Sequence, residues 1–191
     1  MAPEPSQKSD RKVFITVGTT NFDSLITAVL QPAVVDLLQS QGYTTLRVQY
    51  GQGVELYQSL YTAELEGVLA KSSMSIGGYA YASGDEITNE IKTSELIISH
   101  AGSGTILEAL RYQKRIIVVP NESLMDNHQK ELANEMAKLN YVIKGSLINL
   151  SNSITKSLDF GYKHFPRKGS KMFSEVIEEE LDHVDKDKMY G

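Results

Sequence analysis

LIISHAGSGTILEA, the stretch Leu96–Ala109, joins a short apolar run to a helical pattern through a turn of glycine and serine. Backbone N–H groups at the start of a helix have no intrahelical acceptor, and they lie at the positive end of the helix dipole. Glycines beside them let an anion approach the main chain. The stretch therefore predicts a strand, an anion-binding turn and a helix, and it indicates a nucleotide or another phosphorylated ligand.

Outward from this stretch, β-branched apolar runs alternate with longer segments at helical spacing, which is typical of an α/β domain with a parallel sheet. Strands are expected at Lys12–Val17, Thr44–Tyr50, Leu96–Ser99, Arg115–Val119 and Tyr141–Lys144. Helices are expected at Phe22–Gln39, Val54–Glu64, Glu86–Thr93, Thr105–Tyr112 and Asp126–Leu139. Pro32 is expected to kink or divide the first helix, and Gly67–Tyr81 to hold a hairpin or one irregular strand.

The length of 191 residues favours one domain. We expect a disordered lead at residues 1–11, a folded domain at 12–165, and a C-terminal amphipathic helix and tail at 166–191. The lead is polar and contains prolines, unlike the apolar core of a signal peptide. In the tail, Ser170–Val184 carries an apolar stripe that either packs on this domain or docks on a partner, and the sequence leaves both interpretations open.

Composition argues against several classes of function. The net charge is −5 and pairs of basic residues are scattered, so nucleic-acid binding is not expected. The chain has no cysteine, which removes disulfides, thiolate metal sites and thiol catalysis. Its four histidines show no paired metal-ligand spacing. No apolar run approaches the roughly 20 residues that cross a bilayer, so no direct membrane span is expected.

Two loops directly follow predicted strands, where ligands bind in doubly wound sheets. They are Val17–Asn21 and Ser99–Thr105. Neither matches the P-loop pattern or the dinucleotide pattern G-x-G-x-x-G, so phosphate binding is favoured without ATP hydrolysis or hydride transfer. The alternative interpretation of the second loop is a tight turn followed by a capping box between Thr105 and Glu108.

A third polar cluster, Leu124–Gln129, opens the next predicted helix. Its alternative interpretation is a capping box between Asp126 and Gln129. Because the two helices follow adjacent strands, their N-termini are expected to point into one crevice. A carboxylate such as Glu108 suits a ribose diol, and amide and imidazole groups suit sugar hydroxyls.

The strings SHAGSGTILEAL and VVPNESLMDNHQ resemble the donor-binding half of GT-B glycosyltransferases. The resemblance is strongest to the family of cytosolic catalytic subunits of the UDP-N-acetylglucosamine (UDP-GlcNAc) transferase that extends dolichol-linked GlcNAc, and it covers Lys12–Lys144. It implies a single Rossmann-like domain with a mostly parallel sheet, equivalent to the C-terminal half of a GT-B enzyme. In that family the transferase is split between two polypeptides, and this chain resembles the soluble one.

The resemblance also assigns residues. It places the first glycine loop and the Gly-Ser-Gly turn against the donor diphosphate, Glu108 on the uridine ribose, and the Asn-His-Gln string near the sugar and diphosphate. The related bacterial cell-wall enzyme has glutamine at the position of His128. The donor-binding residues so implied are Gly18, Thr19, Gly102, Ser103, Gly104, Thr105, Glu108, Asn127, His128 and Gln129.

The resemblance implies transfer of GlcNAc from UDP-GlcNAc, a substrate rather than a cofactor, to dolichol-diphosphate-GlcNAc. It implies an inverting reaction, no cofactor and no required metal. It further implies a membrane-anchored, acceptor-binding partner subunit, which holds this cytoplasmic chain on the cytosolic face of the endoplasmic reticulum. The general base is unassigned, with His128 as one candidate and a partner residue as the more economical one.

Two other functions fit the same loops. One is a self-sufficient nucleotide-sugar transferase or epimerase, which activity of the purified chain alone would favour. The other is a non-catalytic regulatory subunit that binds a nucleotide sugar, because a fold alone does not establish catalysis. Loop variants that change control but spare turnover would favour that function.

Overall fold

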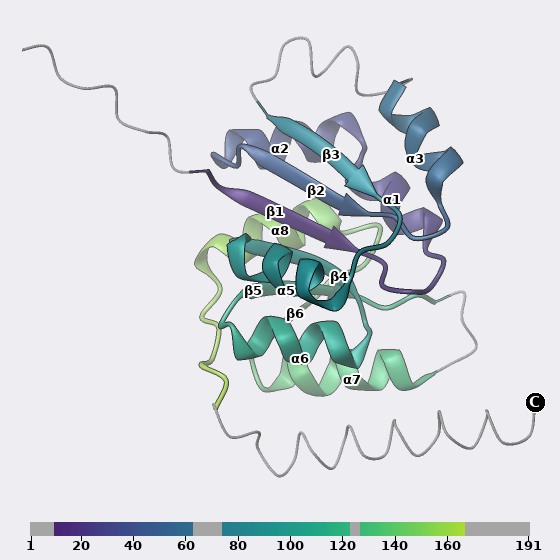
Figure 1. Cartoon of the computed structure of the whole chain (residues 1–191). Coiled ribbons are helices and arrows are strands. Elements are labelled where there is room, and N and C mark those ends of the chain that lie inside the picture. The colour runs from purple at the N-terminus through teal and green to yellow at the C-terminus, as the bar shows by residue number, and fades with distance from the viewer. Residues whose placement is uncertain (1–9, 63–73, 123–126, 167–191) are drawn as a thin grey trace, which may run out of the picture.

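The computed structural model describes residues 10–62, 74–122 and 127–166. In this part of the chain, six strands form one sheet in the order β3-β2-β1-β4-β5-β6, and all paired strands are parallel (Figure 1). The strands are β1 (Lys12–Thr16), β2 (Thr45–Gln49), β3 (Ser75–Tyr79), β4 (Leu96–His100), β5 (Arg115–Val119) and β6 (Ile143–Lys144). The predicted α/β class and parallel sheet are confirmed, and the strand order is that of a doubly wound fold.

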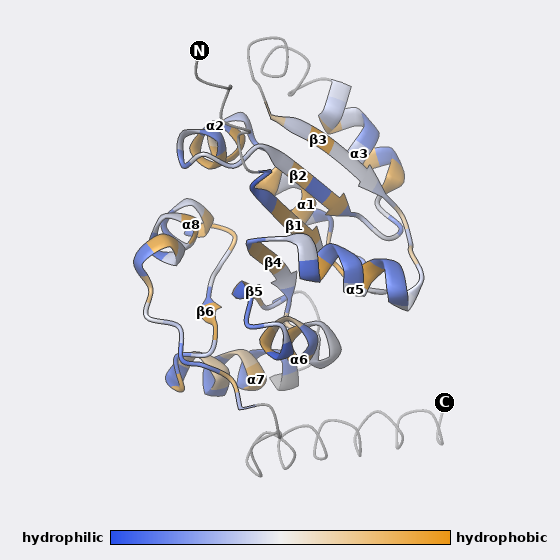
Figure 2. Cartoon of the chain, turned by 60° about the vertical axis from the view of Figure 1, so that its left-hand side comes forward, coloured by the Kyte–Doolittle hydropathy of each residue, from blue (hydrophilic) through white to orange (hydrophobic). Residues whose placement is uncertain are grey.

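Helices cover both faces of the sheet. They are α1 (Asp23–Val29), α2 (Pro32–Ser40), α3 (Val54–Leu60), α5 (Gly84–Thr93), α6 (Ser103–Arg111), α7 (Asn127–Lys138) and α8 (Leu150–Asp159). One apolar cluster joins α1, α2, α3 and α8 to the sheet, and a second joins α5, α6 and α7. Successive strand residues alternate between them, with Val13 and Ile15 in the first and Phe14 in the second. Figure 2 shows that α5, α7 and α8 each carry both hydrophilic and hydrophobic residues. This is expected of helices that pack one face on a sheet and expose the other to solvent.

The element boundaries confirm most of the expected pattern. Pro32 divides the first predicted helix into α1 and α2 and occupies the first position of α2, where its missing N–H costs nothing. The described part of Gly67–Tyr81 is one parallel strand, β3, and residues 67–73 lie outside the described residues. Helix α8 was not delimited from the sequence, because its buried side includes serines. Ser153 and Ser157 are buried there with their hydroxyls bonded to helix carbonyls.

Two residues assigned to the lead are bound to the domain. The Asp10 carboxylate accepts hydrogen bonds from the hydroxyls of Thr44 at 2.8 Å and Thr45 at 2.7 Å. The Arg11 guanidinium pairs with Glu95 at 3.0 Å. Residues 1–9 lie outside the described residues, as do Ser170–Val184 and the rest of the predicted C-terminal helix and tail beyond residue 166.

Helix α5 begins with a capping box. The Ser83 hydroxyl accepts a hydrogen bond from the Glu86 N–H at 3.3 Å, and the Glu86 carboxylate accepts one from the Ser83 N–H at 2.8 Å. Two N–H groups that the helix leaves unpaired are thereby satisfied. The box fixes where α5 starts, and so where its later residue Thr88 lies.

We predict that Ser83→Ala lowers the free energy of unfolding by about 1 kcal/mol, because the first turn of α5 loses its cap. Urea denaturation of the full chain measures the change. The matched control is Ser151→Ala. Ser151 is exposed and lies in α8, a helix whose N-cap residue makes no side-chain hydrogen bond. Equal stability of Ser83→Ala and the unmodified chain would contradict a stabilising cap.

Candidate functional site

The carboxyl ends of β1 and β4 meet at the point where the strand order reverses. From β1 the chain winds outward to β2 and β3, whereas β4 leads to β5 and β6 on the other side. In such sheets the crevice beyond the reversal point is where ligands bind. The loop Val17–Asn21 follows β1, and Ala101 and Gly102 connect β4 to α6. The structure therefore brings the two predicted glycine loops to one edge of the sheet.

The side chain of His100 fills the space between these loops. A Cβ atom added to Gly18 would lie 2.4 Å from its ring Cε1, and one added to Gly102 would lie 2.3 Å from its Nε2. His100 is only 6% exposed, and its Nδ1 lies 3.4 Å from the Thr16 carbonyl oxygen. Both glycines are therefore required by the same imidazole, which packs the two loops together.

Burial lowers the pKa of His100 below its usual value of 6.5, although the contact with the Thr16 carbonyl acts in the opposite direction. The ring is therefore uncharged at neutral pH, and it contributes to the site through packing rather than through charge. The histidines show no paired metal-ligand spacing, so no role for His100 was predicted. The signal that could have found it is its position at a strand end, two residues before Gly102.

Polar side chains hold the first loop in a left-handed turn. Gly18 has a φ of +62°, a conformation that glycine adopts without strain. Its N–H donates to the Thr16 hydroxyl at 3.0 Å, and its carbonyl accepts from the Gln49 amide at 2.8 Å. The Thr16 hydroxyl also hydrogen-bonds to Gln49. Thr19, the next residue, is exposed at the edge of the sheet.

The N-terminus of α6 has no side-chain cap. Gly102 is the N-cap residue, and the first intrahelical bond runs from the Ile106 N–H to its carbonyl at 3.1 Å. The N–H groups of Ser103, Gly104 and Thr105 therefore have no acceptor within the helix. A Cβ on Gly104 would meet nothing within 4 Å, so the main chain is open there. This arrangement fits an anion.

The alternative interpretation of this turn is wrong. The helix begins at Ser103, two residues before its predicted start, so Thr105 lies inside the first turn rather than at the cap. Instead, Glu108 accepts a hydrogen bond from the hydroxyl of Thr88 on α5. Glu108 is half-buried, and this bond places its carboxylate between α5 and α6.

The third predicted cluster opens α7, at the same edge of the sheet. Asn127 is the first residue of the helix, and nothing is described of its side chain or that of His128. Gln129 follows, and its Oε1 is buried without a hydrogen-bond partner among the described residues. A buried amide oxygen without a donor is costly, and a ligand hydroxyl would satisfy it. The alternative capping box needs Asp126, which lies outside the described residues.

The loop after β5 also contacts the loop after β1. Asn121 is buried, and its amide donates to the carbonyl of Asn21 at 3.2 Å. The loops after β1, β4 and β5 thus form one continuous edge.

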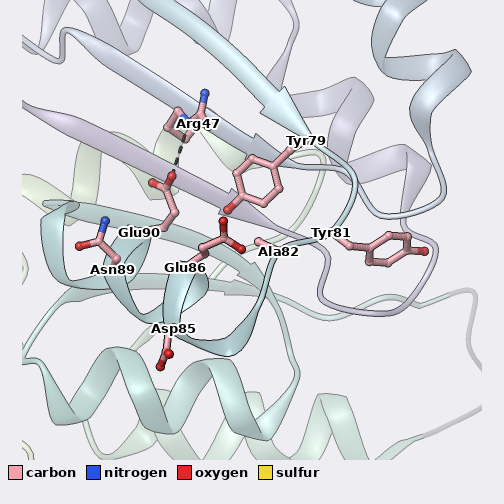
Figure 3. Close-up of a pocket in the computed structure, with 8 residues that line it drawn as sticks. All are labelled: Arg47, Tyr79, Tyr81, Ala82, Asp85, Glu86, Asn89 and Glu90. Carbon is pink, nitrogen blue, oxygen red and sulfur yellow. Dashed lines mark ion pairs between the residues drawn. The ribbon is translucent and has the colours of Figure 1, made fainter.

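A separate hollow lies beside α5, over β2 and β3, with a volume of about 470 Å³. Figure 3 shows Arg47 paired with Glu90, at 3.5 Å, and Tyr79 beside them. The Arg47 guanidinium lies 5.4 Å from the centre of the Tyr79 ring. None of the predicted donor-binding residues lines this hollow. The candidate site is therefore the open edge formed by the glycine loops, not this hollow.

The described ranges, 10–62, 74–122 and 127–166, lack two features. They contain no group of three or more His, Asp or Glu side chains placed to hold a metal ion. They also contain no helix with the length and apolar character needed to cross a membrane.

Comparison with known proteins decides the family. Residues 12–181 match the glycosyltransferase family 28 C-terminal domain. The chain belongs to this family. Relatives named UDP-N-acetylglucosamine transferase subunit ALG13 include the Yarrowia lipolytica protein, 34% identical over 173 residues that cover 88% of this chain and 83% of that protein. The Homo sapiens protein is 40% identical over 126 residues, 66% of this chain, and the match spans only 10% of its length.

Solved structures agree with the family 28 assignment. An NMR solution structure of ALG13 matches with a TM-score of 0.69 and 26% identity, covering 88% of this chain and 95% of that one. The crystal structure of Acinetobacter baumannii MurG matches with a TM-score of 0.60 and 19% identity, covering 81% of this chain and 42% of that one. The expected fold, equivalent to the C-terminal half of a GT-B glycosyltransferase, is confirmed.

We predict that Gly102→Ala lowers the free energy of unfolding by about 1–3 kcal/mol, because its Cβ overlaps the His100 ring. The matched control is Gly104→Ala in the first turn of α6, where the added methyl group meets open space. Urea denaturation compares the two. Equal losses would show that the imidazole does not set the requirement for glycine.

The lowered pKa of His100 also predicts how stability depends on pH. In the unfolded chain His100 takes up a proton as pH falls through about 6.5, whereas in the folded chain the buried ring stays neutral to lower pH. Protonation therefore favours the unfolded chain, and stability is lost as pH falls below 6.5. Replacement His100→Gln removes this contribution and flattens that part of the profile. The control His164→Gln changes an exposed ring and keeps the slope. An unchanged slope in His100→Gln would contradict a buried neutral imidazole.

Proposed function

We propose that this chain is the donor-binding, catalytic subunit of an N-acetylglucosaminyltransferase. It moves GlcNAc from UDP-GlcNAc to dolichol-diphosphate-GlcNAc and acts with a membrane-anchored partner. The observation that carries the proposal is the edge where two glycine loops close on His100 beside the uncapped N-terminus of α6, within a family 28 domain. The names of its relatives, UDP-N-acetylglucosamine transferase subunit, support the donor.

In this proposal the UDP diphosphate lies against the start of α6. The unpaired N–H groups of Ser103 and Gly104 donate to its oxygens, and the glycine loop at Gly18 and Thr19 forms the other wall. Glu108, held by Thr88, binds the ribose hydroxyls. The Oε1 of Gln129, which has no partner among the described residues, accepts from a sugar hydroxyl. Asn127 and His128, the first two residues of α7, lie with Gln129 near the sugar and diphosphate in this proposal.

The reaction is an inverting displacement at the anomeric carbon. The acceptor hydroxyl oxygen forms the new bond, the bond to UDP breaks, and its electron pair stays on the diphosphate. Negative charge on the leaving group grows as the bond breaks, so the fixed dipole of α6 stabilises the transition state more than the ground state. His100 is buried between the loops, and burial lowers its pKa and so weakens it as a base, so we assign it the positioning of the loops rather than the proton transfer. We assign the general base to the partner's acceptor side.

A partner is required by this proposal because the described residues supply one sheet domain, the donor half. The word subunit in the relatives' names supports an assembly. The partner binds the lipid acceptor and holds the chain at the cytosolic face of the endoplasmic reticulum. Transfer then takes place between the two polypeptides.

We predict that Glu108→Ala weakens UDP-GlcNAc binding tenfold or more, about the effect of losing hydrogen bonds to a charged group. Calorimetric titration measures affinity, and transfer to dolichol-diphosphate-GlcNAc is measured in the complex with the partner. The control is Glu131→Ala, which removes an exposed carboxylate from α7. Unchanged affinity and transfer in Glu108→Ala would remove this residue from the donor site.

The same assay separates the proposal from its alternatives. The chain is expected to be inactive alone and active with the partner. Transfer by the chain alone would favour a self-sufficient enzyme. Transfer by the complex that survives loss of UDP-GlcNAc binding to this chain would favour a regulatory subunit.

A further inference from the structure

A second hollow lies at the opposite edge of the sheet from the glycine loops. Its volume is about 240 Å³, and its polar lining comes from Gln113, Lys114, Arg115, Tyr162, Lys163 and His164. Arg115 is the first residue of β5, so this is the edge where strands begin. In Figure 1 the chain after α8, drawn in yellow-green, runs along the side from which β1 starts. Nothing in the proposed donor site reaches it.

The chain segment after α8 is fixed against this edge by hydrogen bonds. The Gln113 side-chain amide donates to the Phe165 carbonyl at 2.8 Å and accepts from the Phe165 N–H at 3.1 Å. The Lys163 N–H donates to the Asn140 carbonyl at 2.9 Å. The Phe165 ring is buried and packs edge-on against Tyr141, with ring centres 5.3 Å apart. Lys163 and His164 are thereby held beside the start of β5.

The lining is strongly basic in an acidic protein. The chain has a net charge of −5, yet the hollow is lined by Lys114, Arg115 and Lys163 and by no carboxylate. Glu95 pairs with Arg115 at 3.1 Å, but it also pairs with Arg11 at 3.0 Å, so one carboxylate serves two guanidinium groups. Burial lowers the pKa of Lys114, which shows the cost of placing its charge there. An anion would offset this excess of positive charge.

Cations near the C-terminal end of α6 also stabilise that helix through its dipole, and an oxyanion would offset their remaining charge. The Tyr162 hydroxyl is buried, with no hydrogen-bond partner among the described residues, and does not open onto the hollow.

We propose that this hollow binds a phosphate group, carried either by a small phosphorylated compound or by a lipid headgroup. The phosphate oxygens accept from the Lys114 and Lys163 ammonium groups and the Arg115 guanidinium. Charge-assisted bonds of this kind are the strong ones, and arginine suits phosphate geometry. The site is independent of the proposed transferase function, since it shares no residue with the donor edge.

The test is a titration of the ¹⁵N-labelled full chain with inorganic phosphate at constant ionic strength. We expect saturable shifts of the Lys114 and Lys163 amides, and about tenfold weaker binding in Lys114→Ala and in Lys163→Ala. The control Lys138→Ala removes a charge of the same sign from α7, where the side chain is 70% exposed, and leaves binding unchanged. The Gly104 amide reports separately on phosphate at the donor edge.

Absence of saturable shifts at this edge, or equal weakening by Lys138→Ala, would overturn the proposal. A vesicle assay then identifies the source of the phosphate. Phosphatidylcholine vesicles with and without phosphatidylinositol are floated with the chain and with Lys163→Ala. Binding that needs both phosphatidylinositol and Lys163 assigns the site to a lipid headgroup. Phosphate binding without vesicle binding assigns it to a small phosphorylated compound.

Discussion

The packing of one imidazole between two glycines is the constraint on which the candidate site depends. His100 ends β4 and lies against Gly18 after β1 and Gly102 before α6, too close to either for a Cβ. Because the ring is buried and neutral, it couples the loops by shape. The first loop is then held in a left-handed turn, and α6 begins beside it with N–H groups that have no acceptor within the helix. The arrangement that fits an anion therefore results from a packing requirement.

The two edges of the sheet differ in the polar groups that they carry. Where strands begin, ion pairs join neighbouring elements, as Glu95 does between Arg11 and Arg115. Where strands end, the polar groups include the backbone N–H groups at the start of α6 and the amide oxygen of Gln129, which has no partner among the described residues. Such groups have little to bind within the domain, so they are available to a ligand. The basic hollow is the exception, because it gathers the cations Lys114, Arg115 and Lys163 at the edge where strands begin.

Local patterns in the sequence predicted the elements better than their contacts. Arg115–Val119 is a strand over the predicted range, and Pro32 divides its helix, because apolar periodicity and proline act locally. The start of α6 was misplaced, since Gly-Ser-Gly is compatible with both a turn and a first helical turn. The role of His100 is tertiary. It contacts Thr16, 84 residues away in sequence, and no spacing rule reveals that. Side-chain chemistry suggested a ribose diol for Glu108 and sugar hydroxyls for the amide of Gln129, and the resemblance narrowed these to the uridine ribose and the donor sugar and diphosphate.

A crystal structure of the full chain with UDP-GlcNAc tests the central claim most directly. The account predicts the diphosphate at the start of α6, with its oxygens within hydrogen-bonding distance of the Gly104 N–H and with the His100 ring still packed between Gly18 and Gly102. A diphosphate bound in the hollow beside Arg47, or anywhere away from the two glycine loops, would contradict it.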